Sequence, residues 1–447
     1  MLEDNGCGGG WARLTRKSRY SYIIRKMSYS KNTELNIIMK NIIDVKNKNA
    51  IGSYVLTWFM LMCSGTVIFN IKYNSLFIPL FVMYSVSYAV LKEKGKLKIQ
   101  INEVVLFLAI VCFILGSTVI HFNDGVAING VVQKMLYLLG TWFACKSMSY
   151  KEYKYCYENL TALLCVVAII IQMLCILGGL PYHWTDINGR LFPLAVGHCV
   201  SWRNGNFYRL CGLYIEPGMF QIVINIALMY LIDDISKGDD KKEKRRKVLF
   251  FVVYIISVLM TMSTSGYIIL IILMSNGIIR YWNLISNKQI KKVLFVLIPI
   301  VLTAIIYGVL HSSVIVNKFE KSNYSLLIRK NDIFAGISLI FNRPILGYGY
   351  GTRKLSLAFS AAGIANISSG LIGESISFGI VVTIILLILV ITNVKGNSRY
   401  ILNASVIVYL ISNMSEACLF FPIMLAFCFS FKLDWNNKVL IDRKSVV

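Results

Sequence analysis

Residues 104–121 read VVLFLAIVCFILGSTVIH, an apolar run that contains no Asp, Glu, Lys or Arg. A helix that crosses the hydrocarbon core of a bilayer needs about 20 mostly apolar residues. Runs of similar character recur along the chain, at 51–71, 73–91, 104–121, 126–145, 159–180, 210–232, 248–263, 266–282, 293–310, 371–392, 400–416 and 418–431. The pattern predicts an all-α, polytopic membrane protein with about 12 transmembrane helices.

The composition supports the same class. Hydrophobic residues make up 56% of the 447 positions, charged residues make up 15%, and the mean hydropathy is +0.64. An ordinary globular domain carries roughly 25% charged residues. These values exclude a cytosolic enzyme, a disulfide-stabilised secreted scaffold and a disordered chain.

The basic residues predict the orientation. Of the 46 Lys and Arg, 34 fall in alternate connecting segments, namely 1–50, 92–98, 146–158, 233–247, 280–292, 393–399 and 432–447. By the positive-inside rule these segments and both termini are cytoplasmic, in a multi-pass protein of the cell (inner) membrane. The net charge of +24 is then explained by topology and anionic lipid, and no nucleic-acid partner is expected.

Three regions follow from this pattern. Residues 1–50 form a basic cytoplasmic segment, 51–431 a transmembrane domain and 432–447 a cytoplasmic tail. Two long extracytoplasmic loops, 181–209 and 311–370, are the expected carriers of recognition and catalysis. The span count stays open at 248–282 and at 400–431, where two short apolar runs follow each other closely. If either pair of runs forms a single span, the predicted orientation of all later segments is reversed.

The first candidate site lies at the end of the 181–209 loop. Arg203 and Arg209 precede Glu216, which is followed directly by Pro217 and Gly218. We expect Glu216 to lie about two turns into a helix, with Arg209 on the same face about 10 Å away. Pro217 and Gly218 would break that helix. A charge and a helix break together favour a functional site, and the alternative is a kinked helix with a structural ion pair.

The second candidate site lies in the 311–370 loop. It contains Arg329, Arg343 and the alternating glycines Gly347, Gly349 and Gly351. Such glycines permit positive φ and close backbone approach to a ligand. The loop has seven Lys and Arg against two acidic residues, a balance that favours anions. The alternative is a solvated basic loop with a glycine turn.

Other charges inside or beside apolar runs are weaker candidates. Glu374 opens the tenth run and is a possible proton acceptor, although an interfacial carboxylate is also simply hydrated. Glu416 resembles it, and Lys134 is interpreted as structural.

No cofactor or metal is expected. The outer segments contain no D-x-D pair and the chain contains no C-x-x-C. Cys199 and Cys211 are 12 residues apart and are candidates for a disulfide if that side of the membrane is oxidising.

These clusters are similar to motifs of one family. The chain resembles the bacterial polysaccharide repeat-unit polymerases (O-antigen polymerase, Wzy type), within the O-antigen polymerase/ligase superfamily. The resemblance covers roughly residues 200–380 and is carried by Arg209-x-x-Gly212-x-x-x-Glu216-Pro217-Gly218, Ser263-x-Ser265-Gly266-Tyr267, Arg329, Pro344-x-x-Gly347-x-Gly349-x-Gly351, and Glu374 followed by Phe378-Gly379. It implies transfer of a growing glycan from undecaprenyl diphosphate to a new lipid-linked repeat unit at the outer membrane face. It also implies membrane lipid, a chain-length regulator and a flippase as partners.

The implied chemistry needs cations on the diphosphate and one base for the acceptor hydroxyl. Arg209, Arg329 and Arg343 are candidates for the cations, and Glu216 or Glu374 for the base. Two alternatives stay open. One is the ligase branch, which typically has a His ahead of the position of Glu374, where this chain has Asn366. The other is a transporter or flippase of lipid-linked oligosaccharides.

Overall fold

The structure is a computed structural model that describes residues 48–93, 100–187, 189–200, 202–204, 207–235, 241–281, 323–364, 367–394 and 399–431. The chain divides into two compact units, Met1–Ile51 and Gly52–Val447, and the helices and strands described below belong to the second, except for the first four residues of α2. The expected cytoplasmic segments 1–50 and 432–447 and the run 293–310 lie almost wholly outside the described residues.

The first half is helical, as the apolar runs predict. Its elements are α2 (Lys48–Met62), a π-helical turn (Val67–Lys72), α3 (Asn74–Glu93), α4 (Ile101–Ile120), a 3₁₀ turn (Phe122–Asp124), α5 (Ile128–Ser147) and α6 (Tyr150–Ile176). The helix α6 begins with a capping box, in which the Ser149 hydroxyl accepts from the Glu152 N–H and the Glu152 carboxylate accepts from the Ser149 N–H. This cap starts α6 well before the apolar run at 159–180.

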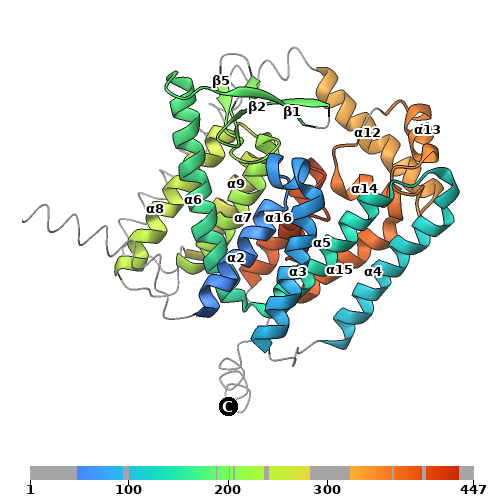
Figure 1. Ribbon diagram of the computed structural model, residues 1–447, viewed down its shortest axis with the longest axis horizontal. Coiled ribbons are helices and arrows are strands. Elements are labelled where there is room, and N and C mark those ends of the chain that lie inside the picture. Colours follow the sequence, from blue (N-terminus) through green and yellow to red (C-terminus); the bar gives the residue numbers. More distant parts are fainter. Residues whose placement is uncertain are drawn as a thin grey trace, which may run out of the picture. The chain divides into compact units, whose positions relative to one another are not determined.

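The second half is also mainly helical (Figure 1). Its helices are α7 (Pro217–Ile235), α8 (Lys241–Thr261), α9 (Thr264–Tyr281), α12 (Asn323–Asn342), α13 (Arg353–Ala361), α14 (Gly370–Phe378), α15 (Ile380–Val394), α16 (Arg399–Ser415) and α17 (Pro422–Leu425). The helices α12 and α13 occupy part of the expected 311–370 loop, so its described residues, 323–364 and 367–370, are not an irregular loop.

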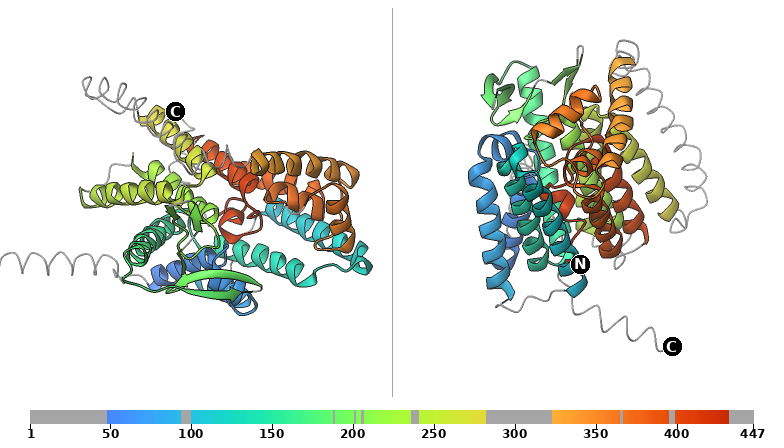
Figure 2. Two further views of the ribbon diagram at one scale, coloured as in Figure 1. Left: turned by 90° about the horizontal axis from the view of Figure 1, so that it is seen from above. Right: turned by 90° about the vertical axis from the view of Figure 1, so that its right-hand side faces the viewer.

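The 181–209 segment is not an irregular loop, and the fold is not purely all-α. β1 (His183–Ile187), β2 (Arg190–Ala195) and β3 (His198–Cys199) form an antiparallel sheet in that order, and β4 (Trp202–Asn204) pairs with β5 (Phe207–Arg209). Gly189, at φ 78°, closes the turn between β1 and β2. Both sheets lie at the same end of the helices as α13, here called the strand end (Figures 1 and 2).

The described residues support a membrane protein without confirming twelve spans. Three helical segments are long and apolar enough to cross a bilayer, Asn74–Lys92, Ile101–Ile120 and Tyr150–Ile176, and three shorter apolar helices lie at Ile51–Met62, Thr264–Ile279 and Ile380–Asn393. Two expected spans are wrong as single helices. Run 371–392 is divided at Gly379, whose φ is 91°, and run 418–431 contains only the four-residue α17 and turns.

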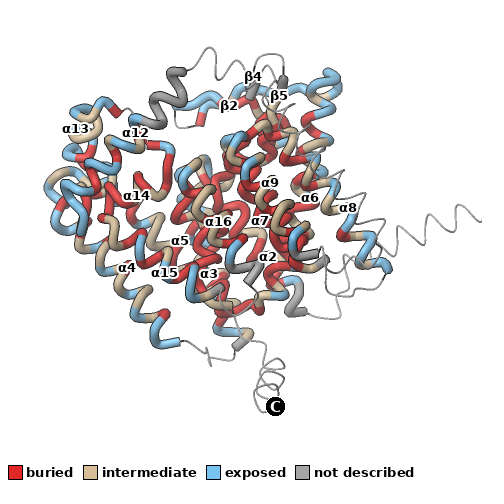
Figure 3. The backbone as a smooth tube through the Cα atoms, turned by 180° about the vertical axis from the view of Figure 1, so that it is seen from behind, coloured by how far each residue is buried: buried red, intermediate tan, exposed pale blue. Residues whose placement is uncertain are grey.

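The helix α7 is the buried centre of the fold. Every residue from 217 to 233 is buried, and the helix packs against α6, α8, α9 and α16 (Figure 3). A helix that is apolar all round needs such an enclosure, because each of its faces contributes to the core.

Charges compensate the last turn of α7. The Asp233 carboxylate is buried and lies 3.0 Å from the Lys154 ammonium of α6, which also lies 2.7 Å from Asp234. The Lys247 ammonium donates to the Asp234 carbonyl at 3.1 Å. These cations also suit the negative end of the helix dipole.

Loss of Lys154 alone should destabilise the protein far more than simultaneous loss of Lys154 and Asp233. Lys154→Met leaves a buried carboxylate without its cation, a change that typically costs about 3–5 kcal/mol. Lys154→Met with Asp233→Leu should regain most of that stability. Thermal unfolding of the detergent-purified protein measures both. Lys92→Met is the control, because its partner Glu152 is partly exposed and such pairs contribute about 0–1 kcal/mol. Equal losses in the single and double variants would contradict the assigned pairing.

The charge pattern also predicts which end faces outward. We expect His183→Cys to react with a membrane-impermeant maleimide in intact cells, and Lys242→Cys to react only after the membrane is opened. The unsubstituted chain gives the background from native cysteines. Labelling of position 242 in intact cells would reverse the orientation.

Candidate functional site

Arg209 ends β5 and is held in the break between α8 and α9. Its Nε donates to the Thr261 carbonyl at 3.0 Å and its Nη2 to the Met262 carbonyl at 3.2 Å. The next residue, Leu210, donates its N–H to the Met260 carbonyl at 2.9 Å. Met262 has a φ of 48°, a strained conformation for a residue with a side chain. The guanidinium orientation is therefore fixed by a distorted backbone turn.

The expected helical placement of Glu216 is wrong. α7 begins at Pro217, so Pro217 starts the helix instead of breaking it. Proline is favoured there, since the first helical N–H has no partner within the helix and φ is already suitable. The preceding residues pair with other segments, with the Ile215 N–H donating to the Gly65 carbonyl at 3.1 Å. Glu216 is exposed directly before the first residue of α7, and it does not share a helix face with Arg209.

A second carboxylate lies at the start of α7. Glu416, which follows α16, places its carboxylate against Gly218, where a Cβ atom would collide with it. The positive end of a helix dipole stabilises an anion at this position. Gly218 therefore provides space for Glu416. In the sequence, Glu416 is recognisable only as a carboxylate between two apolar runs. That pattern is too common to identify a functional residue.

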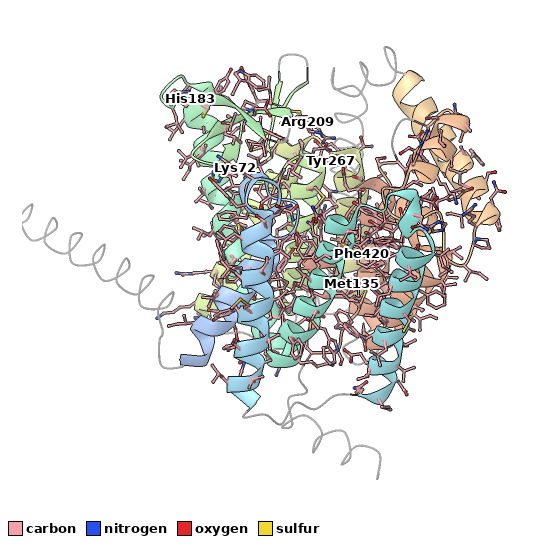
Figure 4. All side chains as sticks on the ribbon, turned by 45° about the vertical axis from the view of Figure 1, so that its right-hand side comes forward. Lys72, Met135, His183, Arg209, Tyr267 and Phe420 are labelled. Atoms are coloured by element: carbon pink, nitrogen blue, oxygen red, sulfur yellow. The ribbon has the colours of Figure 1, made fainter. Side chains whose placement is uncertain are left out.

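Arg209 connects electrostatically to both carboxylates. Burial lowers the pKa of the Arg209 guanidinium from its ordinary value, and the nearby Cys211, Glu216 and Glu416 oppose this shift. Tyr267 also acts on Arg209, and Figure 4 shows the two side chains near each other at the start of α9. Two acids at the start of α7 thus act electrostatically on one buried cation at the strand end.

Polar groups join the α8–α9 break to α7. The Ser263 and Ser265 hydroxyls lie 3.1 Å apart, and the Gln221 amide donates to Ser265 at 3.4 Å. The Asn225 amide donates to the Gly266 carbonyl at 3.3 Å. The α8–α9 break, which carries the Ser263–Tyr267 motif, therefore packs against α7 just after the Arg209–Gly218 motif.

Glu374 belongs to a neighbouring cluster around Lys134. The Lys134 ammonium of α5 pairs with the Glu374 carboxylate of α14, and both side chains are 12% exposed. The ammonium also lies 4.5 Å from the Tyr350 ring centroid and 5.1 Å from that of Phe420. Within the described part of the chain, one oxygen of Glu374 has no hydrogen-bond partner.

The two clusters are joined by the segment that follows α16. The Gly370 N–H, at the start of α14, donates to the Glu416 carbonyl at 3.1 Å. Residues 416–420 thus carry Glu416 toward Arg209 and Phe420 toward Lys134. Figure 4 shows Phe420 deeper among the helices than Arg209.

The three alternating glycines adopt the expected positive φ. The angles are 64° at Gly347, 81° at Gly349 and 66° at Gly351. Added Cβ atoms at these positions would collide with segments of the same chain, in order Ser377, His121 and Ala127. The close backbone approach is therefore internal, and contact of these glycines with a ligand stays a prediction.

The three other arginines of the predicted sites are Arg203, Arg329 and Arg343. Arg343 is exposed, with its guanidinium 4.9 Å from the Tyr348 ring centroid. Arg203 falls in β4 and Arg329 in α12, and their side chains lie outside the part of the chain that the structure describes.

The donor groups and the comparisons with known proteins complete the description. Within the described residues, no group of three or more His, Cys, Asp or Glu side chains is arranged to hold a metal ion. No protein-family profile and no curated protein matches the chain.

Proposed function

We propose that this protein is a membrane glycosyltransferase that polymerises undecaprenyl-diphosphate-linked repeat units into a surface polysaccharide, O-antigen or capsule. The observation that carries the proposal is the convergence of Arg209, Glu216 and the α8–α9 break at one end of the helices. These are the motifs through which the chain resembles repeat-unit polymerases. Their convergence at the strand end supports one shared site.

The reaction requires little from the protein beyond charge and position. The acceptor hydroxyl oxygen attacks the anomeric carbon of the donor sugar, and the bond from that carbon to the diphosphate oxygen breaks. The diphosphate leaves with the electron pair, and a base accepts the hydroxyl proton. Arg209 neutralises the leaving group, because its planar guanidinium binds phosphate oxygens through several donors.

Glu216 is the better candidate for the base. Its carboxylate is exposed beside Arg209, where an incoming hydroxyl has access. Glu374 is mostly buried and paired with Lys134, so accepting a proton would require that ion pair to separate. We therefore assign proton transfer to Glu216 and a structural role to Glu374.

Glu416 is assigned as a positioning residue. Its carboxylate lies against Gly218 in the first turn of α7 and also acts electrostatically on Arg209, so its charge stabilises both the helix start and the guanidinium. Its removal should weaken donor binding without removing the base.

One observation favours a second function, a carrier of lipid-linked oligosaccharides. The helices α14 and α15 are interrupted at Gly379, and discontinuous helices are typical of transporter sites. Deletion of the gene and electrophoresis of the surface glycan separate the two. A ladder that collapses to a single repeat unit supports the polymerase, whereas loss of all attached glycan supports a carrier or a ligase.

Arg209→Lys should slow polymer formation by about 30- to 1000-fold. The loss of one charge-assisted contact to the diphosphate costs about 2–4 kcal/mol in the transition state, and a lysine cannot reproduce the fork. Initial rates with a lipid-linked repeat unit in membrane vesicles measure the effect. Arg190→Lys is the matched control, because Arg190 is an exposed arginine of the same outer segment. Equal rates for both variants would remove Arg209 from the site.

Glu216→Gln should abolish chain growth while membrane abundance stays normal, because it keeps the shape and removes the base. Glu243→Gln, at the far end of α8, is the control and should retain activity. If Glu216 is instead only a partner of Arg209, the variant Arg209→Leu with Glu216→Leu should polymerise glycan. That result would refute catalytic roles for both residues.

Glu374→Gln should lower protein abundance, because it leaves the Lys134 ammonium buried without its carboxylate. Adding Lys134→Met should restore abundance, and with it polymer length on gels. Restored abundance without any polymer would instead assign Glu374 to the reaction.

A further inference from the structure

Two cysteines meet at the strand end, beside the segment that carries Arg209. Cys199 belongs to β3, and Cys211 follows β5 by two residues. Their side chains are 1% and 0% exposed, within a cluster that includes Val67, Ile187 and Phe192. The surroundings are apolar on several sides, so neither thiol is placed for solvent chemistry in the folded protein.

The thiols and their backbones are in direct contact. The Cys211 thiol is hydrogen-bonded with the Cys199 thiol, and the Cys199 N–H donates to the Gly212 carbonyl at 2.8 Å. The Cys211 sulfur also lies 3.6 Å from the Arg209 carbonyl oxygen. Both cysteines are in the thiol form in the structure, and their hydrogen-bonded side chains and paired backbones bring them into the proximity that a disulfide requires.

We propose that Cys199 and Cys211 form a disulfide that fastens β3 to the segment carrying Arg209. The reaction is thiol–disulfide exchange with an oxidant that itself bears a disulfide. The S–S bond of the oxidant breaks, the Cys199–Cys211 bond forms, and two electrons and two protons pass to the two thiols of the oxidant. The proposal rests on the strand end facing the oxidising side of the membrane, and it does not depend on the proposed reaction.

The time of formation follows from the burial. Exchange requires a thiolate, and burial raises the pKa of the Cys211 thiol well above its ordinary value. The folded pair is thus a poor nucleophile, so the bond forms while the segment is still accessible during folding. Once closed, the bond is protected from reductants by the same apolar cluster.

The consequence of the bond is a fixed position for Arg209. The guanidinium is already held by carbonyls of the α8–α9 break, and its backbone is held through β5 and through the hydrogen bond from Leu210 to Met260. A disulfide two residues further on would connect that turn covalently to the β1–β3 sheet. It therefore limits movement of the turn between Arg209 and Glu216.

The test uses the full-length native chain. Cells are acid-quenched and denatured with N-ethylmaleimide to block free thiols, and the chain is then digested with trypsin without reduction. Cleavage after Arg190, Arg203 and Arg209 places the two cysteines in separate peptides, 191–203 and 210–237. Mass spectrometry should find these two peptides joined, and dithiothreitol should separate them.

The same digest contains its control. Peptide 155–190 includes Cys156, Cys165 and Cys175 and should carry maleimide at all three positions before reduction. In the variant Cys199→Ala, Cys211 should become alkylated without reduction, which shows that its protection came from Cys199. Peptides 191–203 and 210–237 found separately, each alkylated before reduction, would overturn the proposal.

Discussion

The burial of α7 from residue 217 to residue 233 is the constraint on which the rest of the structure depends. A helix enclosed on every face gains from apolar contact along its whole length, but its first N–H groups and last C=O groups have no partners within the helix. In a membrane protein, unpaired backbone groups cost several kcal/mol each if they face hydrocarbon. Charged residues are therefore required at the two ends of α7, although the middle of the helix excludes them.

The two ends meet this requirement differently. At the last turn, Lys154 and Lys247 of the surrounding helices compensate Asp233 and Asp234, and each partner is bound in place. At the first turn, the Glu416 carboxylate lies on Gly218, and Glu216 is exposed beside it. One end is closed by neighbouring helices, while the other retains a carboxylate accessible to a ligand. The candidate site therefore lies where helix stabilisation and access to solvent coincide.

The sequence predicted the helices better than the breaks between them. Apolar runs located α3, α4 and α5 closely, because an apolar run near 20 residues with at most one charged residue has few alternatives in a membrane. The same signal failed at 418–431 and 210–216, since hydropathy reports burial and not backbone conformation. Both stretches are mostly buried, but apart from the short helix α17 they form turns and irregular backbone. The pair Asn188-Gly189 is a hairpin signal in the expected loop, and a hydropathy pattern does not detect it. Motif residues were found, but their contacts were not, because Glu416 reaches Gly218 from two hundred residues away.

The breaks themselves explain why the polar groups gather at one end. A strained residue such as Met262, or a positive-φ position such as Gly379, interrupts helical hydrogen bonding and exposes carbonyl groups. Arg209 uses two such carbonyls at the α8–α9 break, which satisfies the backbone and also fixes the guanidinium. A residue that served only to satisfy the backbone would not need two carboxylates beside it. The positive charge of Arg209 also acts on Glu216 and Glu416, so the α8–α9 break and the start of α7 are coupled through one guanidinium.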